Sequence, residues 1–244
     1  MKELLKILKT DIMKLKSSKL FWVHLFIPLL GNLLFLSYYR ASKWGDFEKL
    51  SAYIQVLGIV FPIMISIVCS ILAQQEYDAG YYQNLFKFGS KIYLNYLSKL
   101  ILLIALGFMA SLIALLVYYF GYNLIGDSVL NIKQYIIIAV ILILSNFSEY
   151  NIHLFLSLRF SKNISIGIAA IETLISALFM TGLGEGRWYF LPAAWGPRYA
   201  IYYLNGIKNY DLKLALIISI IFTVLIFLSV IIWFNKWEGN RLEE

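Results

Sequence analysis

The chain has 244 residues, of which 61% are hydrophobic and only 14% are charged, and its formal net charge at pH 7 is +7. Soluble domains are closer to half apolar and a quarter charged, so this composition excludes an ordinary soluble enzyme. The positive charge does not indicate nucleic-acid binding, because excess lysine beside membrane spans is the usual topology signal and also suits an anionic lipid surface.

Residues 1–19 are predicted to form a basic amphipathic helix. Leucine and isoleucine recur at helical spacing from Leu4 to Leu15, and the lysines fall largely on the opposite side. Helices of this kind lie flat in the membrane interface. The alternative is a soluble cytoplasmic helix that packs on the rest of the protein.

Six long apolar runs follow, and each is predicted to be a membrane-spanning helix. A bilayer takes about 20 residues of helix, and continuous rather than alternating runs favour helices over barrel strands. Lys99 lies early in the third run, so we expect either that the helix projects into the cytoplasm or that Lys99 snorkels to the surface. The predicted spans are Leu20–Tyr39, Ile54–Ala73, Ile92–Tyr119, Tyr135–Leu158, Ile164–Leu183 and Leu212–Phe234.

The distribution of basic residues predicts the orientation. Most of the 21 Lys and Arg residues precede the first span or lie in the 75–99 region, the 159–163 turn and the tail. These regions should be cytoplasmic, so both termini are predicted to lie inside the cell. We therefore expect an all-α, multi-pass membrane protein with one transmembrane domain, residues 1–244, made of the amphipathic helix 1–19, a six-span core 20–234 and a cytoplasmic tail 235–244.

A short polar segment, residues 74–84, separates the second and third spans. It contains Glu76 and Asp78, a glycine and three tyrosines, and Asp78-Ala79-Gly80 can end one helix and begin another. We predict a short cytoplasmic helix that lies across the membrane and docks onto a partner. An ordinary polar turn is the alternative.

Three polar side chains of the fourth span, Asn146, Glu149 and His153, recur at i, i+3 and i+7 and so share one helix face. Glu149 and Glu172 are each about ten residues, or roughly 15 Å, from the cytoplasmic end of their spans. An ionisable group at that depth costs at least about 2.5–3.5 kcal/mol, so it should face protein or water and have a partner. Three interpretations remain open: a polar lining that meets substrate, interhelical hydrogen bonds that fix the packing, and a neutral, protonated glutamate.

The connection between the fifth and sixth spans, residues 182–206, is aromatic but interrupted by glycine and proline. Trp and Tyr favour the headgroup level. We predict an interfacial or re-entrant helix near Phe190–Leu204 on the outer side, with a plain surface loop as the alternative.

The sequence contains none of the common catalytic motifs. It has no G-x-x-x-x-G-K-[ST] phosphate loop, no H-E-x-x-H, no G-x-S-x-G and no Cys/His cluster with metal-ligand spacing. No enzyme activity, cofactor or metal is therefore predicted for this chain.

Three stretches resemble ABC exporter permeases of the ABC-2 type and, more narrowly, the permease subunits of lantibiotic-immunity transporters. Glu76–Leu85 is similar to that family's acidic-Gly-x-x-Gln-Asn-Leu segment. Leu191–Arg198 is similar to a Pro-x-x-Trp-x-x-Arg stretch of the outer loop, and Trp233–Gly239 is close to a Trp-Glu-Gly ending. That ending favours the permease type usually lettered G over the type lettered E.

The resemblance implies a complex in a bacterial cell membrane. A second, related permease and two copies of a separate ATPase, which binds the ATP and Mg²⁺, would complete it, and it would remove a cationic antimicrobial peptide from the membrane. Residues 76–85 would be the coupling helix that receives the motion of the ATPase, and the segment 192–198 would gate the outer side. The implied contact residues are Glu76, Asp78, Gly80, Gln83 and Asn84 for coupling, and Pro192, Trp195 and Arg198 for the gate.

Two other functions are weighed against this one. A proton-coupled secondary transporter would use Glu149, His153 and Glu172 as proton sites, although the sequence shows no inverted repeat. An ABC exporter permease for another lipid-soluble substrate would share the fold and differ only in its cargo.

Overall fold

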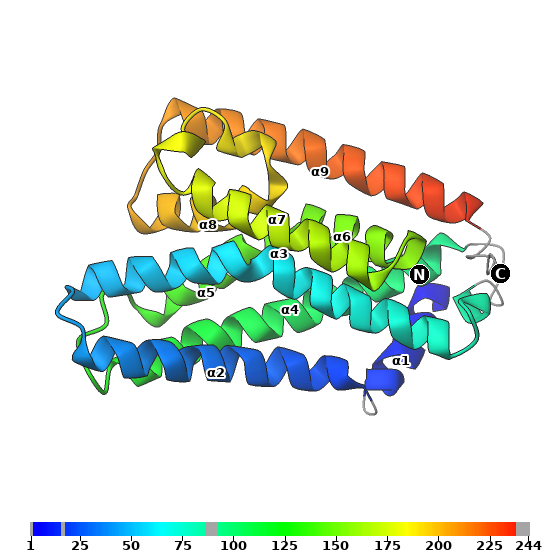
Figure 1. Cartoon of the computed structure of the whole chain (residues 1–244), viewed down its shortest axis with the longest axis horizontal. Helices are drawn as coiled ribbons and strands as arrows, with labels where there is room; N and C mark the ends of the chain where they lie inside the picture. Colours follow the sequence, from blue (N-terminus) through cyan, green and yellow to red (C-terminus); the bar gives the residue numbers. More distant parts are fainter. Residues whose placement is uncertain (1, 16–17, 86–91, 238–244) are drawn as a thin grey trace.

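The computed structural model describes residues 2–15, 18–85 and 92–237, and the regular structure in these ranges is entirely helical. Long helices lie side by side along the longest axis of the molecule (Figure 1). The helices are α1 (Lys2–Leu15), α2 (Lys19–Ala41), α3 (Asp46–Asp78), η1 (Gln83–Leu85), α4 (Tyr93–Tyr122), α5 (Ile132–Ser145), α6 (Phe147–Arg159), α7 (Lys162–Phe179), η2 (Gly182–Gly184), η3 (Trp188–Phe190), α8 (Pro192–Leu204) and α9 (Tyr210–Lys236).

Five of the described helices, α2, α3, α4, α7 and α9, are long and apolar enough to cross a membrane. The pair α5 and α6 makes a sixth crossing if it is counted as one span, and it is bent by 44° at its break. The prediction of an all-α membrane protein is confirmed. The fourth span, however, was expected to be one continuous helix, and the structure divides it at Asn146.

Polar side chains explain the break. Ser145 Oγ donates to Ile141 O at 2.5 Å, and Asn146 Nδ2 donates to Leu142 O at 2.8 Å. Side-chain bonds to the preceding turn compete with the helix ladder and bend helices. Asn146 itself has φ −93° and ψ 8°, outside the helical region, and α6 begins at the next residue.

Helix α3 is the central helix of the bundle. It packs against α6, α7 and α8 and carries many of the buried side chains. Large apolar side chains of α2 and α9, such as Leu34 and Ile220, remain exposed, as expected for helices that face lipid. The two halves of the bent span have different neighbours, because α5 packs on α4 and α8 whereas α6 packs mainly on α3, α7 and α9.

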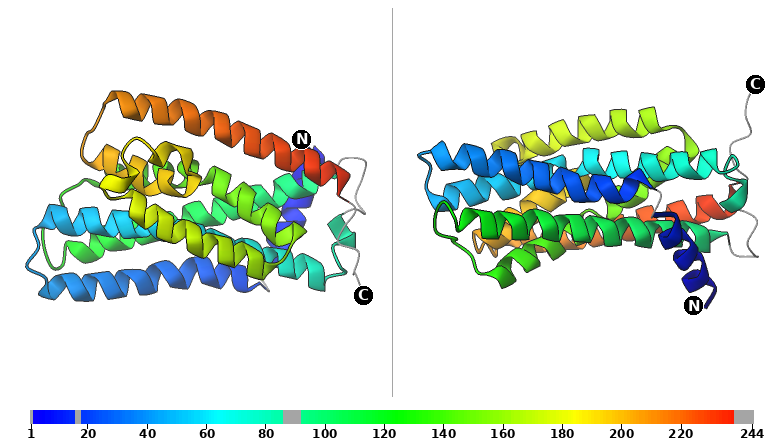
Figure 2. Two further views of the ribbon diagram at one scale, coloured as in Figure 1. Left: turned by 45° about the horizontal axis from the view of Figure 1, so that its top comes forward. Right: turned by 90° about the horizontal axis from the view of Figure 1, so that it is seen from below.

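Helix α1 lies across one end of the bundle, at a steep angle to the long helices (Figure 2). We call this end, where the last turn of α9 also lies, the α1 end. The predicted N-terminal helix is therefore present. It packs on α4 and buries Asp11, so it is held by protein contacts as well as by its amphipathic character.

The predicted helix near Phe190–Leu204 is also present, as α8. It lies among the long helices at the end opposite α1 (Figure 1), packs on α3, α5 and α7, and buries nearly all of its first turns. The chain therefore leaves α7, turns back into the bundle and emerges through α8 before α9 begins. A plain surface loop does not describe this segment, and the re-entrant form does.

The contact between α3 and α8 depends on a glycine. A Cβ atom added to Gly58 would lie 2.7 Å from Pro197 Cα, which is too close for the two backbones to keep their positions. We expect Gly58→Ala to lower the free energy of unfolding by about 1–3 kcal/mol, the usual cost of overpacking. Denaturant unfolding in detergent measures this change.

Gly31 on α2 offers the matched control, because a Cβ there would meet no atom within 4 Å. Alanine is the better helix former by up to about 1 kcal/mol, so Gly31→Ala should leave stability unchanged or raise it. Equal stability of the two variants would contradict the close α3–α8 contact.

Candidate functional site

The polar segment between the second and third spans begins as the last turns of α3. The helix continues through Asp78, so the separate helix predicted for residues 74–84 is corrected: its first part belongs to α3. A tight turn follows, in which Gly80, Tyr81 and Tyr82 have φ values of 136°, 51° and 65°, and then η1. The predicted helix end at Asp78 is confirmed, whereas residues 86–91 lie outside the described part of the chain.

Glu76 is not an exposed contact residue. It is 4% exposed, and its Oε1 accepts hydrogen bonds from Lys99 Nζ at 2.9 Å and from Lys14 Nζ at 2.8 Å. Lys99 also donates to Asp11 Oδ1 at 3.1 Å, and Ser98 Oγ donates to Asp11 Oδ2 at 2.6 Å. We call Asp11, Lys14, Glu76 and Lys99 the α1–α3–α4 ion network.

Lys99 does not snorkel to the surface, and the projection of α4 into the cytoplasm stays a prediction. The Lys99 side chain is 3% exposed, because carboxylates from α1 and α3 meet it inside the protein and remove the need to reach the surface. Two cations and two anions balance in the network, as buried charges must. The network therefore joins the first helix, the end of α3 and the start of α4 into one unit.

Other predicted coupling residues do reach the surface. Asp78 and Gln83 are exposed, and Asp78 Oδ1 accepts a hydrogen bond from Gln74 Nε2 at 2.8 Å. Gly80 is half-buried, and its positive φ allows the chain to reverse there. The side chain of Asn84 lies outside the described residues. Its role and the roles of the other coupling residues stay predictions.

Sequence reasoning missed a contact between two of the three family-like stretches. Tyr82, in the turn after α3, packs against Trp237 with ring centroids 5.3 Å apart. Trp237 also stacks on Trp233 of α9 at 5.1 Å. The end of α9 thus supports the turn, and the aromatic character of both stretches was the available signal.

In the middle of the bundle, three of the four predicted intramembrane polar residues come together. His153 Nε2 lies 2.8 Å from Glu172 Oε2 and 3.3 Å from Glu149 Oε2. His153 Nδ1 lies 3.2 Å from Ser165 Oγ, which in turn lies 2.8 Å from Ser66 Oγ of α3. We call Glu149, His153 and Glu172 the carboxylate–histidine cluster. The structure brings the three side chains together, and their role stays a prediction.

Asn146 is not part of this cluster, because its side chain bonds to the backbone of its own span. Its side chain bonds back to Leu142 O at the break, and its Nδ2 would lie 2.6 Å from a Cβ at Gly196 of α8. It therefore shapes the bend and the contact with the re-entrant helix.

The predicted outer-gate residues hold the re-entrant segment in place. Arg198 is 6% exposed and donates to Phe179 O through Nε at 2.7 Å, to Thr181 O through Nη2 at 3.0 Å and to Glu185 Oε1 through Nη1 at 2.8 Å. Trp195, 1% exposed, donates from Nε1 to Tyr189 O at 3.0 Å.

Pro192 is the first residue of α8, where a missing N–H is harmless. None of the three gate residues forms an open surface. A gating role for them stays a prediction.

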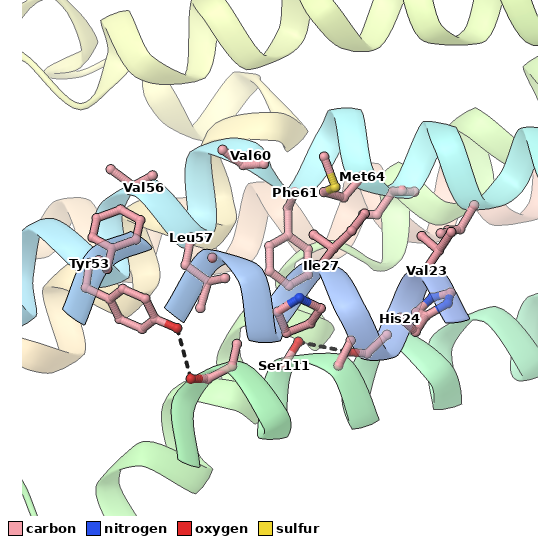
Figure 3. A pocket seen from close by; sticks show the side chains of 18 of the residues that line it. Val23, His24, Ile27, Tyr53, Val56, Leu57, Val60, Phe61, Met64 and Ser111 are labelled. Atoms are coloured by element: carbon pink, nitrogen blue, oxygen red, sulfur yellow. Dashed lines mark hydrogen bonds between the residues drawn. The ribbon is translucent and has the colours of Figure 1, made fainter. Parts of the chain in front are cut away.

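A lateral pocket, which sequence reasoning also missed, opens between α2 and α3. Its volume is about 270 Å³, and α4 forms its floor (Figure 3). The lining is almost wholly apolar, with Val23 and Ile27 on α2 facing Val60 and Met64 on α3. Gly31 of α2 lines the pocket and has no side chain to fill it. A glycine within an apolar run was the feature of the sequence that could have indicated the pocket.

Comparison with known families completes the description. The family described as ABC-2 family transporter protein matches residues 7–184, which run from within α1 to beyond the end of α7. No curated protein and no solved structure matches the chain. The match covers most of the chain and agrees with a bundle of apolar helices long enough to cross a membrane. The chain is therefore a multi-pass membrane protein that belongs to the ABC-2 transporter family, whose members are membrane transport components that lack an ATPase domain and work with a partner ATPase.

Proposed function

We propose that this chain is a permease subunit of an ATP-driven exporter that removes a cationic antimicrobial peptide of the lantibiotic class from a bacterial cell membrane. A second, related permease and two copies of an ATPase, which binds ATP and Mg²⁺, complete the complex, and both termini lie in the cytoplasm. The resemblance of residues 76–85, 191–198 and 233–239 to lantibiotic-immunity permeases supports the peptide as cargo.

The observation that carries the ATP-driven mechanism is the α1–α3–α4 ion network beside the turn after α3. Exposed Asp78, Tyr81 and Gln83 offer a polar and aromatic surface to a partner. Glu76, two residues before Asp78, connects that surface to α1 and α4 through Lys14 and Lys99. A displacement of the turn by a docked ATPase would therefore move three helices together.

The lateral pocket supports a substrate that is dissolved in the membrane. Its rim residues Ile27 and Val56 are 38% and 39% exposed, on faces that the apolar helices would turn toward lipid. A lipid-soluble molecule, or the apolar side chains of an amphipathic peptide, would reach the pocket from the bilayer without crossing water. The same property would serve another lipid-soluble cargo, so the experiment must compare cargoes.

A single experiment separates the candidate functions. Cells that express the complete complex are exposed to a lantibiotic, with a lipophilic dye as the comparison cargo, before and after a proton uncoupler is added at constant ATP. We expect protection against the lantibiotic to require a hydrolysing ATPase and to persist after the proton gradient collapses. Substitution of the catalytic base of the ATPase serves as the control.

Two outcomes would contradict the proposal in different ways. Loss of protection with the uncoupler would favour a proton-coupled transporter, which the short contacts among Glu149, His153 and Glu172 make chemically reasonable. Export of the dye without protection against the lantibiotic would keep the ATP-driven permease and replace its cargo.

A further inference from the structure

The carboxylate–histidine cluster has more acidic groups than its protein surroundings can neutralise. Among the described residues, the ion pairs of Glu149 and Glu172 are with His153 alone. Glu149 and His153 have side-chain exposures of 1% and 0%. With both carboxyl groups ionised, the cluster needs two units of positive charge, since an uncompensated buried charge costs several kcal/mol. A single imidazole supplies at most one.

Glu149 gives the clearest indication that the cluster binds a ligand. The residue is fully buried, and neither of its carboxylate oxygens accepts a hydrogen bond from the described residues. Its Oε2 nevertheless points at His153 Nε2, 3.3 Å away. Buried polar groups in native proteins nearly always have partners, so an unbonded carboxylate aimed into a cluster of donor atoms indicates a ligand between them.

The spacing of the donor atoms fits a metal ion. One atom from each of Glu149, His153 and Glu172 lies within 4.8 Å of the other two. Zinc binds imidazole nitrogen and carboxylate oxygen at about 2.0–2.2 Å in tetrahedral geometry, which places neighbouring ligand atoms about 3.4 Å apart. The two distances from His153 Nε2, 2.8 Å and 3.3 Å, require only small adjustments to meet that value.

The environment of His153 also matches that of a metal ligand. Metal-binding histidines usually donate their second ring N–H to an acceptor, which fixes the tautomer and the ring orientation. His153 Nδ1 faces Ser165 Oγ at 3.2 Å, and Ser66 Oγ holds Ser165 at 2.8 Å. His153 Nε2 is also within hydrogen-bond distance of Glu172 Oε2, at 2.8 Å. With the proton on Nδ1, bonded to Ser165, the lone pair of Nε2 faces the two carboxylates and can bind a cation between them.

We propose that the carboxylate–histidine cluster binds one divalent transition-metal cation of the Zn²⁺ class, through His153 Nε2 and one oxygen each from Glu149 and Glu172. The charge of the ion balances both carboxylates. A nitrogen donor beside two oxygen donors favours zinc, cobalt or manganese over calcium and magnesium, which take oxygen ligands. The ion reaches the site past Glu172, whose side chain is 16% exposed. Once bound, it ties α6 to α7 beside the break in the fourth span.

The test uses the full chain, purified in detergent, freed of metal with a chelator and titrated with Co²⁺. We expect one Co²⁺ per chain, a visible d–d absorption band, displacement by Zn²⁺ and a rise in melting temperature on metal binding. Glu149→Gln keeps the shape of the side chain and removes its charge, so it should weaken Co²⁺ binding at least about 100-fold. Loss of the second-sphere partner in Ser165→Ala should weaken binding by about 10–100-fold.

The other histidine of the chain provides the control. His24 lies on α2, away from the cluster, with Nδ1 2.7 Å from Leu20 O. His24→Ala should bind Co²⁺ as the parent does, whereas His153→Ala should not bind it.

Absence of the Co²⁺ band in the parent chain would overturn the proposal without any variant having to fold. So would equal binding by Glu149→Gln. An infrared carboxylic-acid band in the metal-free chain that Glu149→Gln abolishes, without any Co²⁺ binding, would show that two protons supply the positive charge instead. The outcome does not depend on which energy source drives transport.

Discussion

Replacing Lys99 with methionine is expected to lower the free energy of unfolding by about 3–5 kcal/mol, because it strands buried carboxylates. Lys99 Nζ lies 3.1 Å from Asp11 Oδ1 and 2.9 Å from Glu76 Oε1, and both acids have nearly buried side chains. After the change, the remaining cation of the network is Lys14, whose side chain is 45% exposed. Denaturant unfolding in detergent would measure the loss of stability. Co-purification of the ATPase would report whether the turn after α3 can still bind it.

Charge balance gives this prediction a matched rescue. Adding Asp11→Asn to Lys99→Met leaves one buried acid, Glu76, with Lys14 at 2.8 Å, so the double variant should recover part of the lost stability. The exposed Lys162, at the start of α7, is the control. Its replacement by methionine should change stability by no more than about 0.5 kcal/mol. If Lys99→Met behaved like Lys162→Met, the network would not be holding α1 to the bundle.

Replacing Arg198 with leucine should lower the free energy of unfolding by about 3 kcal/mol or more, since hydrogen bonds to a charged group contribute about 1.5–3 kcal/mol each. The guanidinium holds the carbonyl groups of Phe179 and Thr181, at the end of α7 and just beyond it, and the carboxylate of Glu185. In the variant, these two carbonyl groups and this carboxylate lose the guanidinium that ties the segment between α7 and α8 to α8. We expect proteolysis between residues 180 and 191 to become much faster, and transport to fail with it.

Arg198→Lys should recover only part of this stability, because a single ammonium cannot reproduce the forked geometry of a guanidinium. Arg187 is an exposed arginine of the same segment, and Arg187→Leu should leave the proteolysis rate near that of the parent. An Arg198→Leu chain that resists protease as well as the Arg187→Leu chain would refute the role assigned to Arg198.

Most of the membrane-spanning helices could be predicted from the sequence, because a bilayer requires long apolar helices and these show as long continuous runs of apolar residues. Their ends were harder to predict. Helix α3 begins at Asp46, eight residues before the predicted span at Ile54, because a helix can continue past the apolar run through residues such as Glu48. The break at Asn146 was missed since hydropathy does not report which polar side chains bond back to the preceding turn.

In the candidate sites, too, some contacts could be predicted from the sequence and others could not. The closeness of Glu149 and His153 follows from a four-residue separation on one helix, and Glu172 could be placed by its depth in the next span. The pairing of Lys99 with Asp11 joins residues 88 positions apart, and no periodic pattern carries that information. Arg198 was predicted as an outer-gate residue. Its carbonyl partners could not be predicted, because they lie near Arg198 only in the folded chain, where the segment after α7 turns back into the bundle.

The break between α5 and α6 has a mechanical consequence. The α5 half of this span packs on α4 and α8, and the α6 half mainly on α3, α7 and α9. The side chains of Ser145 and Asn146 donate to the carbonyl groups of Ile141 and Leu142, so these two carbonyl groups keep a partner when the two halves change their angle. The junction can thus act as a hinge. The α6 half tilts together with α3, while the α5 half, which packs on the re-entrant helix α8, keeps its position.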